Sequence, residues 1–252
     1  MPHREDALIE LYFAPTPNGW KATIFMEEAG LDFKLCVVNL SKGEQHSASF
    51  LKISPNNRMP AIVDRTVSPP VTVFESGAIM AYLCDTQAKC RRLLPTEPRA
   101  RSSVLQWVFW QTGNQGPMAG QLSHFVNYAP HVDPNADHSY AENRYRNEFD
   151  HCFEVMERQL SQTQFLGGDS YSIADIICWP WCLSYKKFKI DMDAYPGVRR
   201  WYLDVKQRKG TSDGMKFGLE QAKKTLGKGN LMSESDKQTL FKQTGRSAAS
   251  KL

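Results

Sequence analysis

The chain has 252 residues, 41% of them hydrophobic and 23% charged, a composition that supports a packed core and excludes wholesale disorder. No apolar run approaches the roughly 20 residues of a membrane span and the polar start lacks a signal-peptide pattern, so we expect a soluble protein with no membrane partner. The net charge of +4 is spread along the chain and does not indicate nucleic-acid binding.

The first ninety residues alternate between strand and helix patterns. Strand patterns occupy residues 8–13, 33–38, 61–63 and 71–74. Helical spacings occupy residues 22–29, which Gly30 ends, then residues 47–53 and residues 76–83. The predicted order of this part is βαβαββα.

The pattern changes after residue 90. Residues 91–98 form a charged, proline-containing linker, and only helical spacings follow it up to about residue 226. We therefore predict an α/β domain over residues 1–90 and an all-helical domain over residues 99–226. Residues 227–252 are rich in Ser, Lys and Gly, and we expect them to form a mobile tail.

The cysteines and histidines give no metal or disulfide pattern. The six cysteines form no CxxC pair, and without a signal peptide we expect reduced thiols that pack as small hydrophobic side chains. His131 and His138 lie seven residues apart in a proline-containing loop, and no HExxH motif occurs. We therefore expect no metal site.

Two local motifs place backbone donors and acceptors at the ends of strands. Met59-Pro60 begins a strand pattern, and if this bond is cis, the Met59 N–H and C=O are presented to an extended peptide; the alternative is an ordinary trans proline. Glu75-Ser76 begins a helical pattern, where free N–H groups bind a carboxylate and Glu75 pairs with an amine. The alternative at Ser76 is a simple helix cap.

A third motif, Thr16-Pro17-Asn18-Gly19, opens the first helical pattern. The positive end of a helix stabilises a thiolate, and the Thr16 hydroxyl and the Asn18 amide are hydrogen-bond donors. Taken alone, the motif favours turn chemistry and helix capping over a thiolate site.

Together these motifs resemble the thioredoxin-like domain of glutathione transferases. The matching stretches are LYFAPTPNGWKATIFMEEAGLDF, FLKISPNNRMPAIVD and FESGAIMAYL, followed in the second domain by LQWVFWQTGNQGPMAGQLSHF and YSIADIICWPW. The Thr-Pro-Asn-Gly form, in place of a catalytic Tyr, Ser or Cys, resembles the bacterial nu class and the fungal relatives of the yeast nitrogen-regulating prion protein. The resemblance covers about residues 8–225 and implies a homodimer that uses glutathione as co-substrate.

The resemblance implies which residues hold the glutathione backbone. Met59 precedes the family's cis-proline and pairs with the cysteinyl part, while Glu75 and Ser76 hold the γ-glutamyl end. Arg58 and Gln45 face the glycyl carboxylate.

Further roles implied by the resemblance concern the sulfur and the dimer. Thr16 and Asn18 lie nearest the sulfur and polarise the thiol, and no side chain need act as a base. Arg144 resembles a basic residue that reaches glutathione across the dimer.

The reaction is left open between disulfide reduction and conjugation to an electrophile. No cysteine lies near Thr16 or Asn18 in the sequence, which fits a mechanism in which the bound thiolate itself attacks a disulfide. Conjugation needs an apolar pocket, and the candidate lining residues are Phe13, Trp20, Trp110, Met118, His124 and Tyr128. The alternative for these side chains is core packing.

Two further classes of function remain as alternatives. One is a non-catalytic glutathione-binding regulator, although only seven residues precede the first strand, where the yeast prion has an Asn/Gln-rich arm. The other is a biosynthetic transferase specific for one secondary metabolite.

Several features concern structure or location. Gly113, Gly116-Pro117 and Gly120 interrupt the first long helix, and Ser172 with Asp175 forms a capping-box pattern that we interpret as structural.

The sequence ends in Ser-Lys-Leu, a peroxisomal address, so we expect an import receptor as a partner and peroxisomal, otherwise cytoplasmic, localisation. Detoxification would be the corresponding role.

Overall fold

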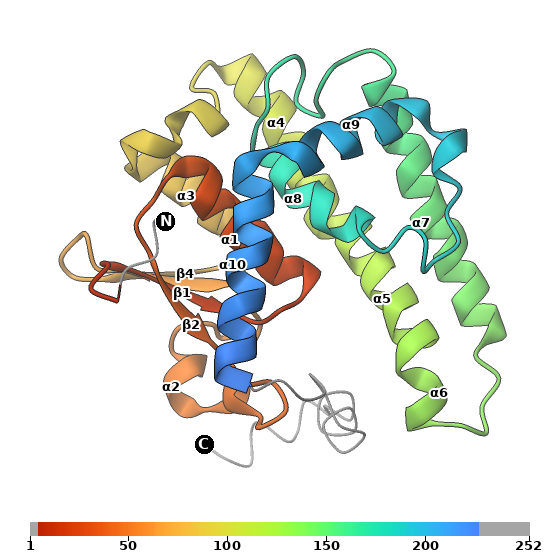
Figure 1. The fold of residues 1–252 in the computed structure, drawn as a ribbon, viewed down its shortest axis with the longest axis horizontal. Helices are drawn as coiled ribbons and strands as arrows, with labels where there is room; N and C mark the ends of the chain where they lie inside the picture. Colours follow the sequence, from red (N-terminus) through yellow and green to blue (C-terminus); the bar gives the residue numbers. More distant parts are fainter. Residues whose placement is uncertain (1–4, 227–252) are drawn as a thin grey trace.

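The computed structural model describes residues 5–226. The expected tail over residues 227–252 lies outside the described residues. An α/β part and a helical part follow one another as predicted (Figure 1). Within residues 5–226, no helix is long and apolar enough to cross a membrane.

The N-terminal part is a four-stranded sheet covered by helices. Its strands are β1 (Ile9–Phe13), β2 (Lys34–Val37), β3 (Ala61–Asp64) and β4 (Val71–Phe74). They lie in the order β2-β1-β3-β4, with β1 parallel to β2 and antiparallel to β3, and β4 antiparallel to β3. With helices α1 (Pro17–Ala29), α2 (Ala48–Leu51) and α3 (Ser76–Thr86), this confirms the predicted order and the thioredoxin-like fold.

Helix α1 begins earlier than its apolar stripe indicates because a cap starts it. The Thr16 hydroxyl accepts a hydrogen bond from the Gly19 N–H at 3.2 Å, and Pro17 occupies the first helical turn. The helix ends as predicted at Gly30, whose left-handed φ of 65° suits glycine. This cap directs Asn18, the second residue of the helix, toward the helical domain.

The helical part contains seven α-helices within the described residues. Its helices are α4 (Pro98–Trp110), α5 (Gly116–Asn127), α6 (Ala129–Val132), α7 (Ser139–Leu160), α8 (Ile173–Cys182), α9 (Pro196–Gln207) and α10 (Lys209–Leu226). Helices α5 and α7 pack side by side along the edge of the molecule (Figure 1). The predicted interruption between α4 and α5 is a π-helical turn over Gln111–Gln115, an irregularity often found at functional sites.

Three glycines spaced four residues apart let α10 lie directly against α1 (Figure 1). A Cβ atom at Gly214 would approach the Ile24 backbone to 2.7 Å, and one at Gly218 would meet the Trp20 ring at 2.6 Å. Gly210 faces Glu28 in the same way. The closely packed pair ties the last described helix to the first domain.

The predicted capping box at the start of α8 is confirmed. Ser172 and Asp175 cap each other's backbone N–H groups, and the buried Asp175 carboxylate also accepts from the Trp201 indole at 2.8 Å. Burial raises the pKa of Asp175 to about 6 despite these donors. Asp175 is thus a structural anchor for α8.

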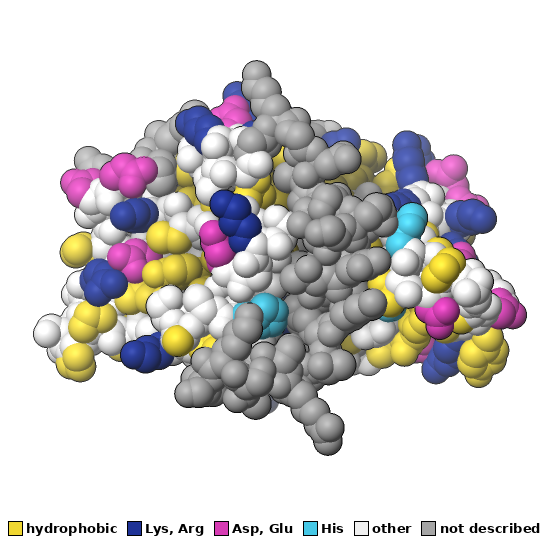
Figure 2. All heavy atoms as spheres, turned by 90° about the horizontal axis from the view of Figure 1, so that it is seen from below, with side chains coloured by type: hydrophobic (Ala, Val, Ile, Leu, Met, Phe, Trp, Pro, Cys, Tyr) yellow, Lys and Arg dark blue, Asp and Glu magenta, His cyan; other side chains and the backbone are white. Residues whose placement is uncertain are grey.

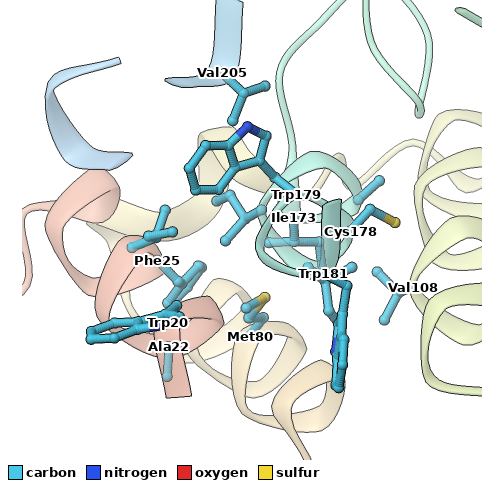
Figure 3. Packing of buried hydrophobic residues seen from close by; sticks show 14 of the residues in the cluster. Trp20, Ala22, Phe25, Met80, Val108, Ile173, Cys178, Trp179, Trp181 and Val205 are labelled. Carbon is cyan, nitrogen blue, oxygen red and sulfur yellow. The ribbon is translucent and has the colours of Figure 1, made fainter. Parts of the chain in front are cut away.

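One hydrophobic cluster runs through both parts of the chain. In Figure 3, Trp20, Ala22 and Phe25 of α1 and Met80 of α3 lie beside the apolar side chains of α8. On the face shown in Figure 2, the Lys, Arg, Asp and Glu side chains that are drawn are interspersed. The shared core fixes the position of the helical part relative to the sheet.

Candidate functional site

A cavity of about 680 Å³ lies between the two parts of the chain. This volume is in the range of small-molecule sites, roughly 300–1,000 Å³. The N-terminal part lines it with Asn18, Lys21, Ser54, Arg58, Met59, Pro60, Phe74, Glu75 and Ser76. The helical part lines it with Gln111, Thr112, Gly116, Pro117, Gly120, Gln121, His124 and Trp181.

Asn18 is the cavity residue at the start of α1. Its side-chain oxygen accepts a hydrogen bond from the Trp181 indole N–H at 3.0 Å, which joins the two parts of the chain. Thr16 does not reach the cavity as the described residues define it, and its hydroxyl oxygen caps α1. The structure therefore brings only Asn18 of the predicted pair to the cavity wall.

Lys21 is a buried cation that the sequence analysis missed. Its ammonium donates to the Gln111 side-chain oxygen at 2.6 Å and to the Ser76 hydroxyl at 3.5 Å. Burial lowers the pKa of Lys21 from 10.5 to about 7, although nearby Cys178 and Glu75 act in the opposite direction. The sequence of α1 mixes polar and apolar residues and gives no local signal for this burial, which arises because α3, α8 and α10 pack around the helix.

Glu75 and Ser76 lie where β4 meets α3, on the cavity wall. Glu75 has a positive φ of 71°, a strained conformation for a residue with a side chain and one that clusters at functional sites. Ser76 is the first residue of α3. The N–H groups of this helix end and the Lys21 ammonium offer several donors to a carboxylate.

The loop before β3 forms another wall of the cavity. The Met59–Pro60 bond is cis, as predicted. The buried Ser54 hydroxyl donates to the Arg58 carbonyl at 2.9 Å and accepts from the Arg58 N–H at 3.3 Å. Ser54 is thus a loop-positioning residue that the sequence analysis did not single out.

Two of the predicted glutathione contacts are placed away from the cavity lining that the described residues form. Gln45 is 2% exposed in the turn before α2, and neither atom of its amide has a hydrogen-bond partner among the described residues. Arg144 is exposed on α7 and forms an ion pair with Glu148, one turn further along. Their roles toward glutathione remain predictions.

The predicted apolar pocket is only partly represented in the described cavity lining, which contains one of its six residues. Phe13 and Trp20 pack together in the core, with ring centroids 5.2 Å apart, because strand β1 and helix α1 turn these faces inward. Trp110 packs edge-on against Trp107. Met118 and Tyr128 also lie outside the described cavity lining, so His124 is the one predicted pocket residue that reaches it.

The helical wall of the cavity combines polar side chains with Pro117 and Trp181. It presents the side chains of Thr112, Gln121 and His124, with burial lowering the pKa of His124. None of the described lining residues is a cysteine, and the six thiols lie elsewhere. No group of three or more metal-ligating side chains occurs within residues 5–226.

Comparisons with known proteins agree with this architecture. The glutathione S-transferase N-terminal domain family matches residues 8–85, and the C-terminal domain family matches residues 137–203. The disulfide-bond oxidoreductase YfcG of Escherichia coli is 45% identical over 211 residues, which are 82% of this chain and 94% of that protein. The chain belongs to the glutathione S-transferase family.

Solved structures extend the comparison to the ligand. A glutathione transferase family member from Pseudomonas fluorescens, with two glutathione molecules bound, aligns with a TM-score of 0.76 at 33% identity, covering 84% of this chain and 94% of that one. The glutathione transferase URE2P6 from Phanerochaete chrysosporium, in complex with oxidized glutathione, aligns with a TM-score of 0.77 at 31% identity, covering 85% and 98%.

Proposed function

We propose that the protein is an enzyme of glutathione-dependent thiol transfer that reduces polar disulfides, with the thiolate of bound glutathione as the attacking group. The cavity suits a peptide that carries both negatively charged carboxylates and a positively charged amine. Arg58, Lys21 and the α3 N-terminus offer sites for carboxylates, and Glu75 offers one for the amine. The Met59 backbone lies beside these groups, where the cysteinyl part would sit.

The chemistry requires a thiolate at neutral pH. A free thiol of pKa about 8.5 is only a few per cent ionised at pH 7. The N-terminus of α1 and the Asn18 amide N–H stabilise negative charge on the sulfur, while the proton leaves to solvent. No described side chain needs to accept it.

The reaction then follows in two balanced exchanges. The bound thiolate attacks a disulfide sulfur, forming a mixed disulfide with glutathione and releasing one thiolate. A second glutathione thiolate attacks the glutathione sulfur of this mixed disulfide, which releases the second substrate thiol and forms glutathione disulfide. Two glutathione molecules are oxidised and one disulfide is reduced.

The observation that carries the proposal is the cysteine-free cavity, whose helical wall presents three polar side chains. Gln121, Thr112 and His124 stand where an apolar electrophile would need hydrophobic side chains. An apolar substrate bound here would displace water from the exposed Gln121 amide, which costs free energy because the amide loses its hydrogen bonds to water. A hydrophilic disulfide keeps this amide hydrogen-bonded.

The relatives support glutathione-dependent disulfide reduction as the function. YfcG is named as a disulfide-bond oxidoreductase, and the aligned structures hold two glutathione molecules or oxidized glutathione. Two glutathione peptides, or their disulfide, correspond to the two exchanges above. We place the chain in the nu-like branch with the fungal nitrogen-regulator relatives, supported by the Thr16-Pro17-Asn18-Gly19 motif.

The test compares two substrates under one set of conditions. Purified protein is assayed with glutathione and hydroxyethyl disulfide, and separately with glutathione and an apolar aryl halide. We expect disulfide turnover to exceed aryl conjugation by at least about tenfold in kcat/KM, the scale of losing about one hydrogen bond at the cavity wall. Conjugation alone would indicate a detoxifying or biosynthetic transferase, and binding without turnover would indicate a regulator.

We also propose a homodimer that closes over the cavity. Phe109 is 71% exposed, one turn before the cavity residue Thr112, and Phe74 is 40% exposed on the edge strand β4 while also lining the cavity. Exposed apolar patches mark protein–protein interfaces, and we infer that Phe109 and Phe74 belong to one such patch. Association of two copies would bury them.

Peroxisomal localisation is a separate proposal. It rests on the last three residues of the sequence, Ser250, Lys251 and Leu252, which lie outside the described residues. A fluorescent protein carrying residues 227–252 at its C-terminus should enter peroxisomes. The same fusion without Ser-Lys-Leu should stay in the cytosol, and identical distributions would contradict the address.

A further inference from the structure

Asn18 and Trp181 meet across the boundary between the two parts of the chain. Asn18 belongs to the first turn of α1 and Trp181 to α8, and both line the cavity. The Trp181 Nε1 lies 3.0 Å from the Asn18 Oδ1. The indole is 8% exposed, so water does not replace it easily.

The chemistry of the indole dictates which way the amide points. An indole N–H is only a donor, whereas an amide has an acceptor oxygen at one end and donor N–H groups at the other. The Asn18 oxygen must therefore face Trp181, which leaves the NH₂ group for another partner. Without Trp181, the terminal torsion of asparagine has two broad, nearly equivalent wells.

The surroundings keep Trp181 in this position. Gly116 and Gly120 of α5 face it, since a Cβ atom at Gly116 would lie 3.7 Å from its Nε1 and one at Gly120 would lie 3.6 Å from its ring. Helix α8 itself is anchored by the buried Asp175 capping box. The indole N–H is thus held by packing on two helices.

We propose that Trp181 is a positioning residue for the reaction: its indole N–H fixes the Asn18 amide so that the NH₂ group donates to the glutathione sulfur. This rests on the proposed function. The reverse amide orientation would place the Asn18 oxygen against the thiolate, and two acceptors repel each other. Trp181 itself need not touch the reacting sulfur.

The test uses a substitution that removes only the N–H donor. Trp181→Phe keeps an aromatic ring in the same packing space but frees the Asn18 amide. We expect kcat for hydroxyethyl disulfide at pH 7 to fall about tenfold, and the pKa read from the pH dependence of kcat to rise by about one unit, the effect of losing one hydrogen bond to a charged group. Glutathione affinity, measured by calorimetry at about pH 5.5 where the bound thiol is protonated in both proteins, should change less than about twofold, since the peptide contacts are elsewhere.

The matched control lies two residues away on the same helix. Trp179 also donates its indole N–H, to the Tyr202 carbonyl at 3.0 Å, but in Figure 3 its ring points toward Val205, away from the ring of Trp181. Trp179→Phe should lower the unfolding temperature and leave the pKa of the bound thiol unchanged. A merely structural role for Trp181 would give the same result at both positions.

The charged and titratable groups around the sulfur stay the same in these variants. Lys21, Arg58, Glu75 and His124 all line the cavity. Any effect that they exert on the thiol is common to the wild-type protein and to both Trp variants. The difference in the pKa of the bound thiol between the two Trp variants therefore reports the effect of the Asn18 amide donor alone.

A double-mutant cycle decides whether Trp181 acts through Asn18. In Asn18→Ala protein, adding Trp181→Phe should change neither kcat nor its pH dependence, because the group to be positioned is gone. A full additional loss would overturn the inference, and so would a Trp181→Phe protein with wild-type kinetics. Wild-type protein that binds glutathione without turnover or a lowered thiol pKa would overturn the proposed function, and this inference with it.

Discussion

At the scale of single residues, the buried ammonium group of Lys21 has the largest effect on the charge of the cavity. Its ammonium lies between Ser76 and Gln111, so one side chain links the start of α3 to the π-helical turn of the helical part. Because burial lowers its pKa to about 7, protonation changes the charge of the cavity near neutral pH. A ligand carboxylate would favour the protonated form.

This shift predicts how stability depends on pH. The folded-state pKa of Lys21, about 7, is below its unfolded value of 10.5, so the unfolded chain binds more protons between these values. The free energy of unfolding should therefore rise with pH in this window, by about 1 kcal/mol per pH unit relative to a Lys21→Met variant. Urea denaturation of ligand-free protein at several pH values from about 7.5 to 9.5 measures it.

The surface Lys206 provides the control for this comparison, because it is exposed on α9. Lys206→Met should run parallel to the wild-type protein across the same pH range. A constant difference between wild-type protein and Lys21→Met at every pH would contradict a perturbed Lys21.

At the scale of elements, the packing of α10 on α1 connects the far end of the described chain to the site. Gly210, Gly214 and Gly218 allow the close approach, and Arg208 adds a bidentate ion pair to Glu28 at 2.8 and 2.9 Å. The Arg208 guanidinium also lies 3.6 Å from the Tyr171 ring centroid. Helix α1, which carries Asn18 and Lys21, is thereby held on its outer side.

Gly214→Ala should destabilise this contact. The added methyl group would meet the Ile24 backbone, which cannot rotate away as a side chain can. We expect the free energy of unfolding to fall by about 1–3 kcal/mol, as measured by urea denaturation.

Gly113→Ala is the matched substitution, since a Cβ atom there meets nothing within 4 Å. It should be neutral or stabilising by up to about 1 kcal/mol, because alanine favours helical backbone. Equal stability of the Gly214→Ala and Gly113→Ala proteins would mean that α10 does not pack against α1 as described.

Local sequence patterns predict the helices and strands, but they do not predict contacts between residues far apart in the chain. The order of strands and helices along the chain and the α8 capping box follow from local spacing and agree with the prediction. The cap of α1 is the alternative that the Thr16 motif offers beside a thiolate site. The cavity contact between Asn18 and Trp181 joins residues 163 positions apart, so no local pattern contains it. The sequence shows that Phe13 and Trp20 are aromatic, but their spacing does not show whether the side chains face the core or the cavity.

At the scale of the whole molecule, the exposed Phe109 and Phe74 argue for association of two copies. Light scattering of the wild-type protein should give the mass of a dimer. Phe109→Asp should shift it toward the monomer, because a buried carboxylate would lack a partner. The control Leu203→Asp changes an exposed apolar residue on α9 and should leave the dimer intact; a monomeric wild-type protein would contradict the proposal.

The central claim is that glutathione bound in a cysteine-free cavity supplies the attacking sulfur. The most direct measurement is intact-protein mass spectrometry on samples acid-quenched during turnover of glutathione with hydroxyethyl disulfide. We predict unmodified protein throughout, because all six cysteines lie away from the cavity lining. A glutathione or substrate adduct on a cysteine, formed and consumed at the rate of turnover, would contradict the account.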